Sequence, residues 1–128
     1  MTAFLLDTHA FIWLSENHSN LPQPLKDRID KADTVYLSIA SLWEIAIKVQ
    51  LGKLALNQPY EAIGIELAAS DILLLPITFE DTVQVRQLPL HHRDPFDRML
   101  IAQALNNALV IVSKDSHFDL YAVERLWV

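Results

Sequence analysis

Cysteine is absent from this chain of 128 residues. Its absence excludes a disulfide, a thiolate metal site and a cysteine nucleophile, so any metal ion must be held by oxygen atoms or imidazoles. Long apolar stretches are also lacking. No segment reaches the length of a membrane span, and the N-terminus has no basic region followed by an apolar core. We therefore expect an intracellular, cytoplasmic protein that does not enter a membrane.

The chain also lacks an excess of positive charge. Its formal net charge of −6 argues against a general nucleic-acid coat, which would carry a basic face. Net charge does not describe local charge, however, and a few basic side chains are enough to form a rim that attracts phosphate. The candidates for this rim are Lys48, Lys53, His91, His92, Arg93 and Arg98.

One globular domain is expected over residues 1–128, because 52% apolar residues are ample for a packed core and no linker or repeat interrupts the sequence. Short apolar runs predict buried strands at residues 2–6, 35–39, 72–76 and 109–112, and the alternating tail at 123–128 predicts an edge strand. Helix-start signals fall between these runs, at Pro22 and Pro24, Ser41, Asn57 and Pro59, and Asp94. The last of these predicts a helix over residues 94–107, and a further helix is expected over residues 78–88. Strands that alternate with helices predict an α/β fold, with a mostly parallel sheet of about five strands and helices on both faces.

Five carboxylates stand where an apolar run ends or is interrupted: Asp7, Glu44, Asp94, Asp97 and Asp115. Asp7 and Asp115 fall at the carboxyl ends of predicted strands, at the edge of a parallel sheet where ligands bind. Acids gathered there would repel one another and raise one another's pKa, and such a cluster is tolerated mainly when a divalent cation neutralises it. The sequence therefore predicts one acidic metal-binding pocket.

The two acids of the Asp94-Pro95-Phe96-Asp97 segment have different predicted roles. Asp94 fits a helix N-cap, because Pro95 takes the first helical position. Asp97 shares a helical stripe with Leu100, Ile101 and Ala104, which is the face turned toward the sheet. An acid on the buried stripe is the better metal ligand, so Asp97 is preferred and Asp94 is a second-tier candidate.

The other acids also have ordinary structural explanations. Asp7 can cap a helix that starts near Ala10, and Asp115 can bond its own backbone in a turn. Glu44 can form an intrahelical salt bridge with Lys48, four residues on. Its apolar neighbours nevertheless predict a partly desolvated acid that needs a partner. The histidines offer no close metal-ligand pair and are expected mostly at the surface or as capping residues.

The ordered set of motifs resembles the PIN-domain ribonucleases, and especially the VapC toxins of bacterial toxin–antitoxin pairs. The matching segments are Leu5-Leu6-Asp7-Thr8-His9, Ser41-Leu42-Trp43-Glu44-Ile45 with Lys48 and Gly52-Lys53-Leu54, His92-Arg93-Asp94-Pro95-Phe96-Asp97-Arg98-Met99-Leu100-Ile101-Ala102, and Ser113-Lys114-Asp115. Each motif alone is weak, but together they cover nearly the whole chain in the order of the family. Ser113 stands where many relatives have threonine, which keeps the hydroxyl.

The resemblance implies a three-layer PIN-like fold and assigns the acidic quartet of metal ligands and catalytic residues to Asp7, Glu44, Asp97 and Asp115. It implies Mg²⁺ or Mn²⁺ as cofactor, RNA as substrate, a small cognate antitoxin as partner, and a homodimer. Further candidates for supporting or substrate contacts are Asp94, Arg93, Ser113 and Lys48. We expect hydrolysis by water rather than by the ribose 2′-hydroxyl, which leaves a 5′-phosphate.

Four other functions remain open from the sequence. A PIN-like nuclease without a toxin role needs the same acids. In an aspartate-dependent phosphoryl-transfer domain Asp7 would be the nucleophile, although His9 stands where such phosphatases place a second acid. A phosphorylatable receiver domain needs a lysine after a late strand, and only Lys114 is available. In a non-catalytic binding module the acids would be caps and salt bridges, with no stoichiometric metal site.

Overall fold

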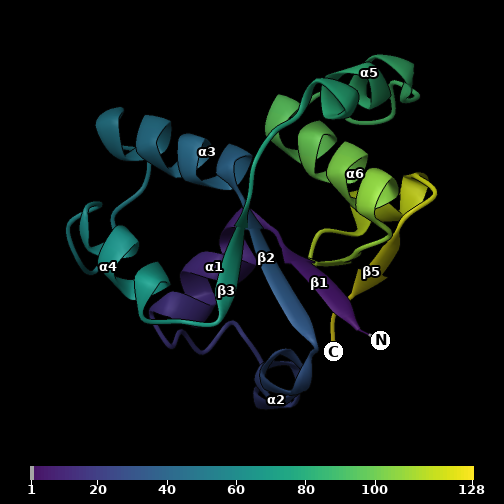
Figure 1. The fold of residues 1–128 in the computed structure, drawn as a ribbon. Coiled ribbons are helices and arrows are strands. Elements are labelled where there is room, and N and C mark those ends of the chain that lie inside the picture. Colours follow the sequence, from purple (N-terminus) through teal and green to yellow (C-terminus); the bar gives the residue numbers. More distant parts are fainter. Residues whose placement is uncertain (1) are drawn as a thin grey trace.

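The structure, a computed structural model, describes residues 2–128 and is built around one parallel sheet (Figure 1). Its strands are β1 (Ala3–Leu6), β2 (Thr34–Ser38), β3 (Ile72–Leu75), β4 (Val110–Val112) and β5 (Glu124–Leu126), in the order β3-β2-β1-β4-β5. The strand order reverses between β1 and β4, which lie side by side at the centre. In such sheets ligands bind beyond the carboxyl ends of the strands at this point of reversal.

Helices cover both faces of the sheet, as the sequence predicts. They are α1 (Thr8–Ser15), α2 (Gln23–Lys31), α3 (Ile39–Gln50), α4 (Ala62–Ala68), α5 (Phe79–Gln87), α6 (Pro95–Asn107) and the 3₁₀ helix η1 (Ser116–Leu120). Apolar residues of α1 to α4 form one core, and those of α6 and η1, with Leu88 directly after α5, form a second core on the opposite face. The predicted three-layer α/β architecture is confirmed, with every strand pairing parallel.

The central strand β1 shows why both faces need a cover. Phe4 and Leu6 are buried in the core with α1, whereas Leu5 between them is buried against α6. Alternate side chains of a strand point to opposite faces, so an uninterrupted apolar strand requires apolar layers on both sides. Asp7 is the first residue after this strand, and its N–H still donates to the Val112 carbonyl oxygen of β4 at 3.0 Å.

Three predicted helix starts were wrong by a few residues. The third helix starts at Ile39 because the buried Ser38 hydroxyl caps it by accepting from Ala40 N at 3.0 Å, so Ser41 lies inside the first turn. The helix expected from Asn57 begins only at Ala62. Asn57 N instead donates to the Glu16 carboxylate at 2.9 Å, which holds the preceding loop against α1. The first helix starts at Thr8 rather than near Ala10.

The predicted helix over residues 94–107 is confirmed. The Asp94 carboxylate is the N-cap and accepts from Phe96 N at 2.8 Å and from Asp97 N at 3.2 Å. The helix ends at Asn107, and Ala108 adopts a left-handed conformation with φ of +53°. This helix has 13 residues, and the helices described within residues 2–128 are all too short or too polar to cross a bilayer.

Candidate metal centre

Asp7 lies at the carboxyl end of β1 and is buried, with 7% of its surface exposed. Its carboxylate caps α1 by accepting from Ala10 N at 2.8 Å, so the predicted cap role is present. Burial raises the pKa of Asp7, and the Ser113 hydroxyl and the Ala10 N–H only partly counteract this effect. A nearby cation would strongly stabilise the ionised form of this carboxylate.

Asp97 occupies the first turn of α6 and faces the carboxyl edge of the sheet. Its Oδ2 lies 2.8 Å from His92 Nε2. Burial and the neighbouring charge of Asp94 raise the pKa of Asp97 to about 7 despite this hydrogen bond. Asp7 adds to the repulsion. The three carboxylates are therefore close enough to disfavour simultaneous ionisation without a counter-charge.

Asp115 follows β4 and is positioned by its own turn. Its N–H donates to the buried Ser113 hydroxyl at 3.0 Å, and its carboxylate accepts from His117 N at 2.9 Å. His117 Nδ1 lies 2.7 Å from the same oxygen. Burial alone would raise the pKa of Asp115, but the bonds to His117 lower it below its ordinary value. Ser113 therefore orients two acids from the interior and does not face solvent.

The structure brings His92, Asp97 and Asp115 into one group whose potential ligand atoms all lie within 4.8 Å of one another. Asp7 stands beside this group. Together with Asp115 it lines an open cavity of about 340 Å³, whose other walls are His9, Trp13 and Lys114. Three of the four predicted acids thus meet at the point where the strand order reverses.

Glu44 is the predicted acid that the structure does not bring into this group. It is buried at 4% exposure on α3, where Oε1 accepts from the Thr8 hydroxyl at 2.6 Å and Oε2 pairs with Lys48 Nζ at 2.6 Å. The pKa of Lys48 is raised by Glu44 first, and also by Asp94 and Asp97. Lys48 therefore brings positive charge toward the acids, and the catalytic role of Glu44 stays a prediction.

The basic rim is smaller than the sequence predicts, because Arg98 serves the fold. Its guanidinium donates to the carbonyl oxygens of Val85, Pro89 and His92 at 3.0, 2.9 and 3.3 Å. Arg93 and Lys53 are exposed and stay available to a polyanion.

Histidines are the residues that the sequence interpretation undervalued. His92 was expected mainly at the surface, yet only 18% of its side chain is exposed and it contacts Asp97. His117 pairs with Asp115. The only sequence signal was proximity: His92 lies two residues before the Asp94 cap, and His117 lies two residues after Asp115.

A divalent cation fits the donors that meet here. Carboxylate oxygens are suitable ligands for Mg²⁺ or Mn²⁺, and a cation would favour the ionised forms of Asp7 and Asp97, whose pKa values are raised by burial. Such an ion lowers the pKa of water and neutralises charge on phosphate oxygens, which are the requirements of phosphodiester hydrolysis.

Comparisons with known proteins agree with this geometry. The PIN domain family model matches residues 4–124. Among solved structures, VapBC2 from Rickettsia felis bound to a promoter DNA fragment has a TM-score of 0.74 at 14% identity, with 98% of each chain covered. DNA-bound VapBC from Salmonella typhimurium gives 0.74 at 18% identity and 98% coverage of each chain. VapBC-1 from nontypeable Haemophilus influenzae gives 0.69 at 19% identity, covering 98% of this chain and 97% of that one.

The search of curated proteins gave no match. The structural likenesses, all below 20% identity, show a shared fold over nearly the whole length. The family model covers all the acids described above, most of β1 and the whole of β2, β3 and β4, from Phe4 to Glu124. The chain therefore belongs to the PIN-domain family of nucleases.

Proposed function

We propose that this chain is a metal-dependent endoribonuclease that hydrolyses RNA phosphodiester bonds and acts in the cytoplasm as the toxin of a toxin–antitoxin pair. The observation that carries the proposal is the meeting of Asp7, Asp97 and Asp115 at the carboxyl edge of a PIN-type sheet. Acids that repel one another in a sheet cleft are suited to a cation and, through it, to a phosphate.

The proposed roles follow from position. Asp7, Asp97 and Asp115 would hold Mg²⁺ or Mn²⁺, directly or through water. Glu44 is the fourth predicted member, and its contact with Lys48 keeps an ammonium group near the acids. Asp94 contributes by starting α6, which sets the direction of Asp97.

The cavity beside Asp7 and Asp115 suits an unpaired RNA strand. Trp13 and His9 line it with aromatic rings whose centroids lie 5.7 Å apart, and Lys114 adds a positive charge. Aromatic rings stack on unpaired bases, while lysine attracts the backbone. The exposed Arg93 is proposed to meet a phosphate on the other side of the acids.

We expect purified wild-type protein to cut single-stranded RNA with Mn²⁺ or Mg²⁺ and to leave 5′-phosphate ends. Because water is the expected nucleophile, a single 2′-deoxy nucleotide 5′ to the cut should not prevent cleavage. Sequencing of the cleaved ends in total RNA identifies the site and the end chemistry. Cyclic 2′,3′-phosphate products would refute hydrolysis by water, and a trapped aspartyl phosphate would favour phosphoryl transfer instead.

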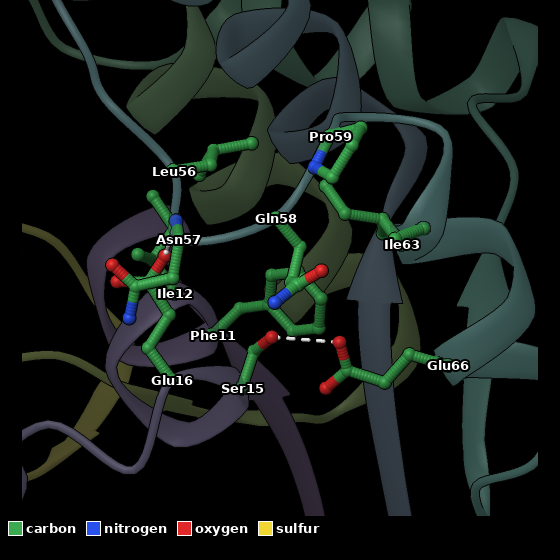
Figure 2. Close-up of a pocket in the computed structure, with 11 residues that line it drawn as sticks. Phe11, Ile12, Ser15, Glu16, Leu56, Asn57, Gln58, Pro59, Ile63 and Glu66 are labelled. Carbon is green, nitrogen blue, oxygen red and sulfur yellow. Dashed lines mark hydrogen bonds between the residues drawn. The ribbon is translucent and has the colours of Figure 1, made fainter.

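We further propose that a small antitoxin covers the groove between α1 and α4. Figure 2 shows Phe11, Ile12 and Ile63 lining this groove together with Glu16 and Glu66. Ser15 donates to Glu66 at 2.7 Å, so a hydrogen bond joins the two helices beside the groove (Figure 2). A partner with apolar side chains and a few basic ones fits this lining.

The same helix connects the groove to the acids. Asp7 caps the start of α1, and residues toward the other end of this helix line the groove. The eight residues of α1 rise by 1.5 Å each, so its two ends are about 12 Å apart. A partner segment of about four extended residues spans this distance. An antitoxin seated in the groove would thus be able to place a basic side chain among the carboxylates.

Filling the groove should separate toxin from antitoxin. We expect Ala62→Trp to weaken binding of the protein encoded by a short reading frame directly upstream by about tenfold or more, since one well-packed contact contributes that much. Ala69→Trp, at the exposed end of α4, is the matched control. Calorimetry on each variant measures the affinity. Equal affinities for both variants would place the partner elsewhere.

A homodimer is proposed through α3. Ile39 and Trp43, four residues apart, form an apolar stripe on this helix, Leu51 follows as its C-cap, and all three are exposed, Trp43 by 60%. Trp43 packs edge-on against Phe96, with ring centroids 5.3 Å apart, which fixes its position at the surface. An equivalent stripe on a second copy would cover these side chains. A monomer mass in sedimentation at micromolar concentration would refute the dimer.

A further inference from the structure

His92 is held in place through both its backbone and its ring. Its N–H donates to the Tyr121 hydroxyl at 2.8 Å, and its carbonyl oxygen accepts from Arg98 Nη1 at 3.3 Å. The ring lies edge-on to the fully buried Phe118, with centroids 6.5 Å apart, and 5.6 Å from the ring of His117. The imidazole therefore has a defined position although it belongs to a loop.

The defined position directs the ring into the acids. His92 Nε2 lies 2.8 Å from Asp97 Oδ2, and an Asp115 oxygen completes a group with all ligand atoms within 4.8 Å. Ligands at adjacent corners of an octahedral ion with bonds of about 2.1 Å are about 3 Å apart, and opposite ligands are about 4 Å apart. Small side-chain rotations are enough for one ion to contact all three residues.

We infer that His92 is a nitrogen ligand of the metal ion in the proposed centre, which makes it a mixed site that selects Mn²⁺ over Mg²⁺. This inference rests on the proposed function and names the ion that it uses. Mg²⁺ is a hard cation that takes oxygen ligands, whereas imidazole is a common ligand of first-row transition ions. An all-carboxylate site lacks the contribution that the nitrogen ligand makes to this preference.

A hydrogen bond between His92 and Asp97 with no metal contact is the competing explanation. It accounts for the 2.8 Å distance but assigns no role to the Asp115 oxygen that lies within 4.8 Å of the other two potential ligand atoms. In that case His92 would be a positioning residue, and the ion would have oxygen ligands only. The two explanations differ in whether a nitrogen atom is bonded to the ion.

Pulsed electron paramagnetic resonance on the Mn²⁺-loaded wild-type protein detects such a nitrogen directly. We expect ¹⁴N coupling to Mn²⁺ in the wild type, loss of this coupling in His92→Gln, and its retention in His117→Gln, the matched control on the neighbouring ring. Bound Mn²⁺ without ¹⁴N coupling in the wild type would overturn the inference, as would coupling that survives in His92→Gln.

Calorimetry provides the second readout. His92→Gln should weaken Mn²⁺ binding by about tenfold or more and change Mg²⁺ binding by less than about threefold, because only the transition ion gains from the nitrogen. Equal losses for both ions would overturn the inference. If Mn²⁺ binds without nitrogen coupling and RNA cleavage is intact, the assignment of His92 as a ligand is overturned and the proposed function is not. No stoichiometric Mn²⁺ binding by the wild type overturns the assignment and the proposed function together.

Discussion

Asp97→Asn is expected to reduce RNA cleavage by about 10²–10³-fold, the usual loss when one preorganised charge-stabilising group is removed. The same change should stabilise the metal-free protein at neutral and alkaline pH. Both effects have one cause: the Asp97 carboxylate is buried beside Asp94 and Asp7, so its charge is costly unless a cation is present. Asparagine keeps the shape of the side chain and removes the charge.

The pH dependence follows from the pKa of about 7 in the folded protein, against the ordinary 3.8. Between these values the unfolded chain releases a proton that the folded chain keeps, so the stability of the wild type falls as pH rises through this range. The stability of the Asp97→Asn variant should not fall in this way, because asparagine does not titrate. The difference in Tm between variant and wild type should therefore grow from about pH 4 to about pH 7 and level off above it.

Thermal unfolding in EDTA across this pH range measures the effect, which we expect to reach several degrees. Asp119→Asn is the control, because Asp119 is an exposed acid whose pKa is lowered by its bond to Arg125 and which lies outside the centre. It should give no rise in Tm. A Tm difference for Asp97→Asn that does not change with pH would contradict the explanation by charge burial, and cleavage close to the wild-type rate would contradict the catalytic role.

Arg98→Ala should lower the free energy of unfolding by about 2–4 kcal/mol, because several hydrogen bonds of a charged donor are lost at once. The guanidinium joins α5 to the loop before α6 through carbonyl oxygens of Val85 and Pro89. The Tyr121 hydroxyl extends this connection by donating to Pro89 O at 2.9 Å. Without the arginine, the loop that carries His92 loses its anchor, so metal binding should weaken as well.

Two comparisons make this prediction specific. Arg98→Lys should recover little of the lost stability, since a single ammonium group cannot reach all three carbonyl oxygens. Arg93→Ala, at the neighbouring exposed arginine, should keep wild-type stability and weaken RNA binding only. Urea unfolding and RNA-binding titrations separate the two outcomes. An Arg98→Ala protein as stable as Arg93→Ala would show that these hydrogen bonds contribute little.

Local patterns were enough to predict the sheet, the helix over residues 94–107 and the capping role of Asp94, whereas the role of Asp97 as a metal ligand stays a prediction. Capping, a proline at the first helical position and the stripe shared with Leu100 act within a few residues, so they can be read from sequence. The start of α3 was misplaced because Ser38 and Ser41 are both good caps. The residue at which β2 ends determines which of the two serines caps the helix.

Contacts between distant segments account for what the sequence could not show. Arg98 was expected in a phosphate-binding rim, but its partners on α5 and on Tyr121 are defined only after α5 and α6 have packed together. The pairing of Glu44 with Lys48 is the ordinary structural explanation that the sequence offers, whereas the bond of Glu44 to Thr8 depends on α1 packing against α3. His92 likewise meets Asp115 only because β4 ends beside the first turn of α6.

The most direct test of the metal-dependent nuclease is the rate of single-stranded RNA cleavage by the wild type with Mn²⁺, in excess EDTA, and by Asp7→Asn with Mn²⁺. We predict rapid cleavage in the first condition only, with folded protein in all three by circular dichroism. Undiminished cleavage in EDTA, or by Asp7→Asn, would contradict a metal centre built on these acids.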